Sequence, residues 1–406
     1  MDPAAFGMAF EKVGLGRRYK SLADNEKKRA MSKNYDCIVL GVGGIGSAAM
    51  YYAASQGWRV LGLDRFPIGH ARGSSHGQTR IIRQAYFEHP DYVPLLKSTY
   101  ELWDDLEKIT GQSLFQRTGL LQVGNPQSSI IQGVKASAEE HALTVREFDN
   151  ATLQDNFPLF HFRDDDVGVL EENAGFLRVE ECVSTFAQAA LEMGAELVEG
   201  VTIEGWDQGA AGYEVTTSQG RFFGRRLIIA AGAWAHQLMP ELDRELRVIA
   251  KHQHWFRIPD ERTRLDKGCP IFFFETAEGY FYGFPDIDGN GTKICEHSGG
   301  TPVENALEVN REIDPVDLER VQHFAHHSLN CPRGIHHDHR VCMYTMSPDE
   351  HFIVDRADDQ VAFACGLSGH GFKFAPVLGK ALVQLLEGSP RADMDFLKLK
   401  RFNDEP

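Results

Sequence analysis

Residues 35–65 read "YDCIVLGVGGIGSAAMYYAASQGWRVLGLDR", and this stretch sets the class of the fold. The apolar residues 37–40 are typical of a buried strand, and they lead into a glycine-rich turn. An apolar helix is predicted over residues 45–56, followed by a second apolar strand over residues 58–63. A strand, a helix and a strand in this order form a βαβ unit, which predicts a parallel sheet and an α/β fold.

The turn in this stretch carries a glycine pattern that is typical of dinucleotide-binding proteins. Gly41, Gly43 and Gly46 form G-x-G-x-x-G directly after a strand and at the start of a helix. Glycines let the backbone approach a pyrophosphate closely, and the helix N-terminus presents free N–H groups to the anion. Asp64, at the end of the second strand, is placed to accept hydrogen bonds from a ribose. The pattern therefore predicts a dinucleotide site, and by itself it leaves NAD and FAD both open.

A second glycine-rich loop near the C-terminus favours FAD. Residues 366–374 read "GLSGHGFKF"; they follow a short apolar strand at residues 361–366 and precede an apolar helix at residues 376–386. The isoalloxazine ring of FAD lies far from its adenine, so a flavin needs a second approach of the backbone. This loop is the segment that we expect to provide it.

Segments typical of a βαβ core lie near both ends of the chain, and aromatic, strand-rich segments lie between them. After the helix that follows Pro90 we expect short strands and turns, then a helix over residues 186–193, a strand over 227–231, aromatic strands over 249–300 and polar helix over 303–331. We predict a cofactor-binding domain made of residues 33–115, 178–248 and 349–400. Residues 116–177 and 249–348 are expected to form an inserted substrate and catalytic domain.

The composition limits the possible partners. With 42 basic and 58 acidic residues the formal net charge is -16, which argues against nucleic acid as the main partner. No apolar run approaches the roughly 20 residues that a membrane span requires, so we expect no membrane association. The seven scattered cysteines predict neither disulfides nor a zinc site, and hence a reducing compartment, the cytoplasm, and no metal. Residues 1–32 are predicted to be a disordered extension, with Met31 as a possible start.

Five stretches of the chain resemble a known enzyme family. They are "GVGGIGSAA", "GSSHGQTRIIRQAY", "YFYGFP", "CMYTMSPDEHFIVD" and "GLSGHGFKFAPVLGK". Together they resemble the family of monomeric sarcosine oxidase and N-methyltryptophan oxidase, FAD enzymes of the D-amino-acid-oxidase-like superfamily. The resemblance runs from about residue 35 to residue 400 and is weaker in the middle. It implies a Rossmann-like FAD domain of the glutathione-reductase type, with an inserted β-rich α+β domain.

The resemblance also implies a chemistry. The expected substrate is an N-methyl or cyclic secondary amino acid, whose C–N bond is oxidised to an imine while dioxygen is reduced to hydrogen peroxide. The expected cofactor is FAD, bonded through its 8α carbon to the sulfur of Cys342. From the residues alone, Cys342 could be a small buried residue, a free thiol or an attachment point, and the buried thiol is the favoured interpretation. Family members also imply a monomer.

Several roles follow from positions that match the family. Arg83 and Lys373 match a pair that binds the substrate carboxylate, for which a guanidinium fork and a point charge are well suited. Lys293 matches a lysine that activates oxygen beside the flavin, where a fixed cation lowers the barrier to forming an anion. His297, Tyr282 and Tyr344 are expected to shape the substrate site rather than to act as acid or base.

Other matched positions concern the flavin. His76 and Arg80 are expected to support its attachment and reactivity, and Ser75 stands where the family often has a second histidine. The full set of expected cofactor contacts is Gly41, Gly43, Gly44, Ile45, Gly46, Asp64, Arg65, Ser74, Ser75, Arg80, Ile203, Ala231, Gly232, Trp234, Cys342, Gly366, Gly369, His370, Gly371, Phe372 and Lys373.

Three alternatives stay open at this point. One is a flavin dehydrogenase with another electron acceptor, one is an oxidase of N-methyltryptophan or glycated amino acids, and one is a flavin-bound scaffold without turnover. The sequence does not choose among secondary amino acids. We expect the substrate pocket to be lined near residues 272–274 and 254–256, where aromatic side chains cluster.

Overall fold

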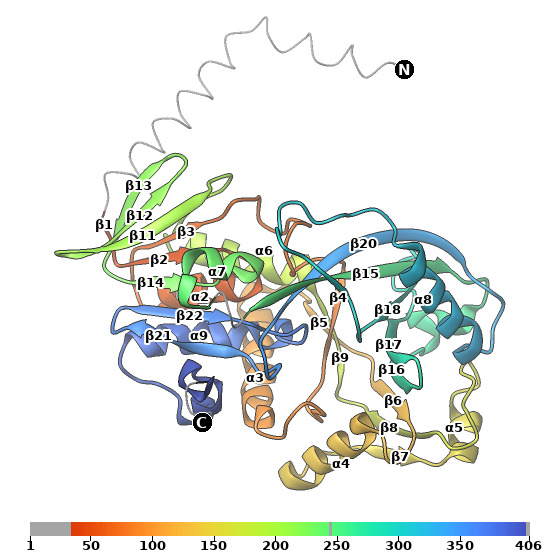
Figure 1. The fold of residues 1–406 in the computed structure, drawn as a ribbon. Coiled ribbons are helices and arrows are strands. Elements are labelled where there is room, and N and C mark those ends of the chain that lie inside the picture. Colours follow the sequence, from red (N-terminus) through yellow and green to blue (C-terminus); the bar gives the residue numbers. More distant parts are fainter. Residues whose placement is uncertain (1–33, 243–245, 403–406) are drawn as a thin grey trace, which may run out of the picture.

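The computed structural model describes residues 34–242 and 246–402 (Figure 1). The extension that the sequence predicts over residues 1–32 therefore lies outside the described residues. Two large sheets lie at opposite sides of the molecule, and two long paired strands of the second sheet, β15 (Arg247–Arg257) and β20 (Ile335–Met346), extend toward the first. Within the described ranges, no helix combines the length and the apolar character that a membrane span needs.

The first sheet has six strands drawn from distant parts of the chain. Its order is β10 (Glu196–Val198), β3 (Val60–Leu63), β2 (Cys37–Leu40), β14 (Leu227–Ile229), β22 (Val361–Cys365) and β21 (Ile353–Asp358). All neighbouring pairs are parallel except β21, which pairs antiparallel with β22 at one edge. The strands are almost fully buried, as expected for a parallel sheet that is covered on both faces. The predicted α/β fold is confirmed.

Helices pack tightly against this sheet and against one another. The glycine turn leads into α2 (Gly44–Ser55), which packs against α6 (Val179–Glu192) and α9 (Ala375–Leu386), while α3 (Tyr92–Thr110) packs against α9. Gly379 lets α9 approach α2 closely, because a Cβ there would lie 2.6 Å from the Ala49 amide nitrogen. A separate small sheet, β1 (Asn34–Tyr35), β13 (Gly220–Gly224), β12 (Gly212–Thr217) and β11 (Ile203–Gly209), lies at the upper left of Figure 1.

The second large sheet has nine strands and is built from aromatic segments. Its order is β19 (Thr301–Pro302), β15 (Arg247–Arg257), β18 (Thr292–Glu296), β17 (Gly279–Phe284), β16 (Ile271–Thr276), β6 (Leu120–Gly124), β8 (Val167–Glu171) and β7 (Arg146–Phe148), with β20 (Ile335–Met346) paired to β15. Helix α8 (Pro315–Ser328) covers one face, where the rings of Phe281 and Phe324 stack 4.6 Å apart. A three-stranded sheet of β4 (Thr79–Ile82), β9 (Gly175–Arg178) and β5 (Phe115–Arg117) completes the fold.

The secondary structure predicted from the sequence is wrong in three segments. Residues 116–177 contain two helices, α4 (Ser129–His141) and α5 (Asn150–Asn156), where only strands and turns were expected. Their N-caps, Ser128 and Asp149, accept backbone hydrogen bonds and so satisfy exposed N–H groups. The helix expected over residues 303–331 is confined to α8, because the Asp314 carboxylate caps it and proline occupies its first turn. Helix α6 begins at Val179, seven residues earlier than expected.

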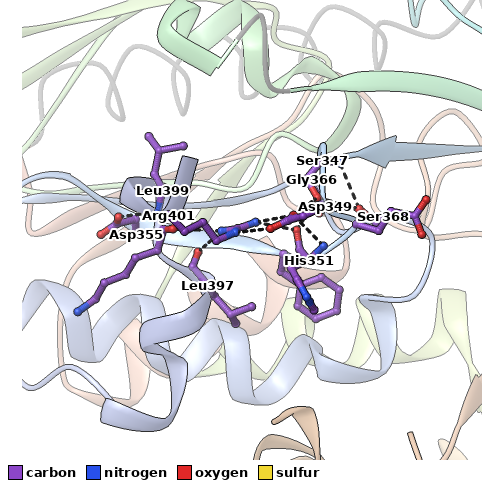
Figure 2. A network of polar contacts seen from close by, with 12 residues as sticks. Ser347, Asp349, His351, Asp355, Gly366, Ser368, Leu397, Leu399 and Arg401 are labelled. Carbon is purple, nitrogen blue, oxygen red and sulfur yellow. Dashed lines mark hydrogen bonds and ion pairs between the residues drawn. The ribbon is translucent and has the colours of Figure 1, made fainter. Parts of the chain in front are cut away.

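A polar network fastens the C-terminal segment to the turn between β20 and β21 (Figure 2). The Arg401 guanidinium donates to both Asp349 carboxylate oxygens, at 2.7 and 3.0 Å, and to the His351 carbonyl at 3.1 Å. The Ser347 hydroxyl donates to that same carbonyl at 2.6 Å, and the Ser347 amide donates to the Ser368 hydroxyl at 3.2 Å. These hydrogen bonds hold the glycine-rich loop after β22 in place. The glycines of the loop have no side chains with which to make such bonds.

Candidate functional site

Two adjoining cavities lie where the parallel strands of the first sheet end. The larger encloses about 1400 Å³ of empty space, counting the part open to solvent, and the smaller about 500 Å³. Arg80, Tyr344, Gly369 and Phe372 line both, so the two cavities share a wall. Ligands of open α/β sheets bind at the carboxyl ends of the strands, which is where the larger cavity lies.

The glycine turn forms one end of the larger cavity. Gly41 has φ +88°, and a Cβ there would lie 2.7 Å from the Ala230 carbonyl oxygen. A Cβ on Gly46 would overlap the Gly41 carbonyl oxygen, so this glycine serves helix–strand packing and does not line the cavity. The Gly44 amide donates to the Ser75 hydroxyl at 3.1 Å. The glycines of the turn therefore present backbone atoms, without side chains, to the cavity.

Asp64 lies at the end of β3 in the same cavity and is only 7% exposed. Its carboxylate accepts from the Val42 amide at 2.7 Å and from the Phe66 amide at 2.8 Å. Burial raises the pKa of Asp64, while these two amide donors counteract part of that shift. The carboxylate is therefore held rigidly, with acceptor capacity left for a ribose hydroxyl.

Most of the expected cofactor contacts line the larger cavity. They are Gly41, Gly43, Gly44, Ile45, Asp64, Arg65, Ser74, Ser75, Arg80, Ile203, Ala231, Gly232, Trp234, Gly366, Gly369, Gly371 and Phe372. Gly46 and Cys342 lie behind its wall, and His370 and Lys373 line the smaller cavity instead. Lining residues that sequence reasoning missed include Phe66, Gly69, His70 and Gly73. The glycines of "GHARGSSHG" were the available signal for this loop.

The residues of the larger cavity fit a dinucleotide. A bare glycine turn meets the N-terminus of α2 at one end, and the loop before α9 brings a second run of glycines to the wall. The indole nitrogen of Trp234 is buried and has no hydrogen-bond partner within the described ranges, as expected of a donor that faces a ligand.

Three cationic side chains, Arg80, Arg83 and Lys373, and one carboxylate, Glu88, line the smaller cavity. The Arg83 guanidinium donates to both carboxylate oxygens of Glu88 at 2.7 Å. Burial alone would raise the pKa of Glu88, but the charges of Arg83, His370 and Lys373 outweigh it and hold the pKa at about 2. Lys373 donates to the His370 carbonyl at 2.6 Å, and burial together with the charge of Arg83 lowers the pKa of Lys373 to about 7.

Tyr86 and His370 form a hydrogen-bonded pair beside these charges. The His370 ring lies 3.0 Å from the Glu350 carbonyl through Nε2, which must donate because a carbonyl only accepts. Burial lowers the pKa of His370 to about 4, so the ring is neutral at pH 7 and Nδ1 accepts from the Tyr86 hydroxyl at 2.6 Å. The pair sets the tautomer of His370 and positions the Tyr86 hydroxyl 3.3 Å from the Lys373 nitrogen.

The opposite side of the smaller cavity is aromatic and uncharged. His297 Nδ1 lies 3.3 Å from the Tyr344 hydroxyl, and burial lowers the pKa of His297 to about 3. Burial raises the pKa of Tyr282 and Tyr344, so both phenols stay protonated at neutral pH. Phe273 completes this side. None of these side chains is a strong base, in keeping with the expectation that they shape the site.

Lys293 lies behind the cavities rather than in their walls. Its ammonium donates to the carbonyls of Gly77 at 2.7 Å and Thr79 at 3.2 Å, and it lies 5.2 Å from the ring of Trp255 and 5.1 Å from that of Phe284. Lys293 is only 1% exposed, and burial lowers its pKa to about 7. The buried charge is therefore sensitive to pH near neutrality.

Cys342 also lies behind the wall of the larger cavity, next to Met343, which lines it. Its sulfur accepts from the Arg80 guanidinium at 3.2 Å and lies 3.4 Å from the Ser74 carbonyl, and both of these residues line the larger cavity. His76 is buried nearby, and neither of its ring nitrogens has a hydrogen-bond partner in the described part of the chain. Burial, reinforced by the charge of Arg80, lowers the pKa of His76 to about 3.

The expected lining of the substrate pocket is correct for one residue only. Phe273 lines the smaller cavity, but Phe272 and Phe274 pack against Phe324 of α8 on the other face of the sheet. Because successive side chains of a strand point to opposite faces, the sequence could have placed Phe273 on one face and Phe272 and Phe274 on the other. Residues 254–256 line neither cavity, so that expectation was wrong. Tyr86 and Glu88 were missed, because no sequence motif distinguishes them.

Comparisons with known proteins agree with this geometry. The family model described as FAD dependent oxidoreductase (DAO) matches residues 36–385. A monomeric sarcosine oxidase of Streptomyces avermitilis is 37% identical over 366 residues, covering 87% of this chain and 94% of that protein. An N-methyl-L-tryptophan oxidase of Yersinia pestis is 34% identical over 380 residues, covering 91% of this chain and 100% of that protein.

A solved structure shows the same fold at lower sequence similarity. The amino acid oxidase NikD of nikkomycin biosynthesis superposes with a TM-score of 0.77 at 21% identity, covering 90% of this chain and 98% of that one. The family model, the relatives and the fold agree over nearly the same residues, which confirms the resemblance seen in the sequence. The chain therefore belongs to the family of FAD dependent oxidoreductases.

Proposed function

We propose that the protein is an FAD-dependent oxidase of N-methyl or cyclic secondary amino acids. The observation that carries the proposal is the smaller cavity, which combines three cations and one carboxylate with uncharged aromatic and imidazole groups and shares a wall with the dinucleotide cavity. Relatives named sarcosine oxidase and N-methyl-L-tryptophan oxidase support it. The products are an imine, which water hydrolyses, and hydrogen peroxide.

In this proposal Arg83 and Lys373 bind the substrate carboxylate. The guanidinium of Arg83 offers a fork that matches a carboxylate. In the structure its Nη2 donates to both oxygens of Glu88, and its Nη1 donates to the Ala85 carbonyl at 3.3 Å. An incoming carboxylate would compete with Glu88 or share the guanidinium with it. Its negative charge would also favour the protonated form of Lys373, whose pKa of about 7 leaves it half charged at neutral pH.

The remaining groups act on the substrate amine. An amine must lose its proton before its C–N bond can be oxidised, and the neighbouring cations Arg80, Arg83 and Lys373 disfavour an ammonium ion in this cavity. His297 and His370 are neutral at pH 7, so they add no further positive charge. When bound, FAD accepts two electrons from the substrate and passes them to dioxygen. The protein supplies orientation and electrostatics.

We further propose that Cys342 anchors the cofactor through a thioether to the flavin 8α carbon and that Lys293 promotes the reaction with oxygen. The Cys342 sulfur accepts a hydrogen bond from Arg80, which lines both cavities, and none of the seven cysteines forms a disulfide. A buried cation such as Lys293 stabilises negative charge that develops on oxygen. His76 and Arg80 would support the attachment.

We also propose the domain boundaries, the cellular compartment and the oligomeric state of the protein. Residues 33–115, 178–248 and 349–400 are proposed as the FAD domain, and each contributes strands to the six-stranded sheet. Residues 116–177 and 249–348 would form the substrate domain, which contains the nine-stranded sheet apart from the first residues of β15. We also propose a cytoplasmic monomer, supported by the unpaired cysteines and by the word monomeric in the names of relatives.

The proposed activity is tested by a peroxide-coupled screen of the holoenzyme against N-methyl and cyclic amino acids. We expect hydrogen peroxide with at least one of them, and loss of the oxidised flavin absorbance when the same compound is added without oxygen. Loss of absorbance without peroxide in air would indicate a dehydrogenase instead. If no secondary amino acid changes the absorbance, the proposed function is wrong.

The role of Lys293 predicts a pH dependence. Because the cationic form exists below the pKa of about 7, reoxidation of the reduced enzyme by air should be fastest below pH 7 and fall as the pH rises through it. Lys293→Met should slow reoxidation by roughly a hundredfold and remove this dependence. Stopped-flow absorbance measures both, with Lys267→Met on an exposed helix turn as the control. A variant that reoxidises at the wild-type rate would refute the role.

The role of Cys342 predicts that the flavin stays with the protein after acid precipitation. Wild-type pellets should remain yellow, whereas Cys342→Ala should release the colour into the supernatant. Cys331→Ala, which alters a partly buried cysteine in a separate hollow beside α8, should behave like wild type. A colourless wild-type pellet would return Cys342 to the buried-thiol interpretation.

A further inference from the structure

Four histidines gather on the β15–β20 ribbon, outside both cavities. His252 and His254 belong to β15, and His336 and His339 belong to β20; we call them the ribbon cluster. One ring nitrogen each of His252, His254 and His339 lies within 4.8 Å of the other two. His254 is fully buried and His252 is 7% exposed, while His339 is partly exposed at the surface. The proposed amino acid oxidation uses none of them.

The register of the ribbon brings the cluster together. His252 and His254 are two residues apart on one strand and so point to the same face, and His339 lies opposite His254. A bulge at Trp255 and Phe256 shifts the register by one residue and brings His336 to that face as well. The opposite face of the same strands carries Lys251 and Cys342, which lie opposite each other in the register, and Cys342 contacts Ser74 in the wall of the larger cavity.

The contacts within the cluster involve unprotonated ring nitrogens, which are the donors that metals bind, and an ion would replace the hydrogen bonds that these nitrogens accept. His252 Nδ1 lies 2.7 Å from His339 Nε2, and His254 Nδ1 lies 3.1 Å from His336 Nε2. In each contact one nitrogen must be unprotonated, because two N–H groups cannot bond to each other. His254 Nε2 lies 2.8 Å from the Asp317 carboxylate of α8, and an N–H there leaves Nδ1 as an acceptor. A carboxylate that orients a histidine in this way is typical of metal sites.

The donor set indicates which ion would bind. Three neutral imidazoles suit zinc and related divalent transition metals, whereas calcium and magnesium prefer oxygen ligands. Zinc–nitrogen bonds of about 2.0–2.1 Å in a tetrahedral site place ligand nitrogens roughly 3.3 Å apart. The His252 and His339 nitrogens would therefore move apart by about 0.6 Å, and the His254 nitrogen, which lies within 4.8 Å of both, would take the same spacing. The partly exposed His339 gives the ion a route of entry.

We propose that His252, His254 and His339 bind one zinc ion, with Asp317 orienting His254. The ion clamps β15 to β20, the strand that carries Cys342 and Tyr344, and it takes no part in the redox chemistry. The proposal is independent of the proposed substrate. It would overturn the sequence-based expectation of no metal, which rested on the spacing of the cysteines and could not foresee ligands brought together by strand register.

A second group of histidines offers an internal comparison. His323, His326 and His327 lie on the exposed side of α8, near Cys331, and the rings of His323 and His327 are 4.1 Å apart. Surface histidines of this kind bind added zinc adventitiously. Any test must therefore separate this α8 group from the ribbon cluster.

The test uses the full-length holoenzyme, treated with a chelator and then titrated with zinc chloride alone. We expect one zinc ion per chain after gel filtration, measured by elemental analysis, and a rise in the thermal unfolding midpoint of the zinc-loaded protein. His339→Gln should weaken zinc binding at least tenfold and remove the rise in midpoint. His337→Gln, an exposed histidine on the same ribbon, and His326→Gln on α8 should leave both unchanged.

X-ray absorption of the zinc-loaded protein identifies the ligand type. Three imidazole ligands without sulfur fit both histidine groups, so the ribbon cluster is supported when this signal is kept in His326→Gln and lost in His339→Gln. A sulfur ligand would point to Cys331 and contradict the proposal. The proposal also fails if the wild-type protein binds no zinc, if His339→Gln binds it as tightly as wild type, or if only His326→Gln loses it.

Discussion

The burial of positive charge beside the two cavities is the constraint on which the site depends. Arg83, Lys293 and Lys373 are at most 5% exposed, and each ammonium or guanidinium group would be costly without acceptors. The fold supplies them as the Glu88 carboxylate for Arg83 and as backbone carbonyls for the two lysines. Because carbonyl groups compensate burial only in part, both lysines have pKa values near 7, and their charge responds to what binds nearby.

Each of the two large sheets positions a different part of the two cavities. The six-stranded parallel sheet presents the glycine turn, Asp64 and the loop after β22 at one set of strand ends. The nine-stranded sheet presents Phe273, Tyr282 and His297 from the other side, so the shared wall of the two cavities lies between them. The Arg401–Asp349 network ties the turn that follows Tyr344 to the C-terminal segment (Figure 2). A cofactor and a small anion can thus be held by parts of the chain that are remote in sequence.

Sequence alone predicted what depends on local pattern. The glycine turn and Asp64 are close in sequence and obey a spacing with a physical meaning, so their placement at a cavity followed directly. The pairing of Arg83 with Lys373 came from the family resemblance, since nothing in the spacing of two residues so far apart indicates it. Helices α4 and α5 were missed because their short apolar stripes look like strands until the caps at Ser128 and Asp149 are recognised.

What could not be predicted depends on contacts between distant segments. Glu88 and Tyr86 gain their importance from Arg83 and His370, and no pattern of neighbours reveals these partners. The expected place of Lys293 beside the flavin came from the family resemblance, whereas its hydrogen bonds to the Gly77 and Thr79 carbonyls depend on a loop more than 200 residues away in the sequence. The ribbon cluster depends on the register of two long strands and on a bulge. Neither can be predicted from the alternation of side chains along a single strand.

The central claim is that the charge of Arg83 holds the carboxylate of the substrate. Its most direct test is the affinity of the holoenzyme for a small carboxylate that lacks an amine, followed through the flavin absorbance. The account predicts saturable binding by wild type, about tenfold to a hundredfold weaker binding by Arg83→Gln, and wild-type affinity for Arg117→Gln, which alters an exposed ion pair. Equal affinity of Arg83→Gln and wild type would contradict it.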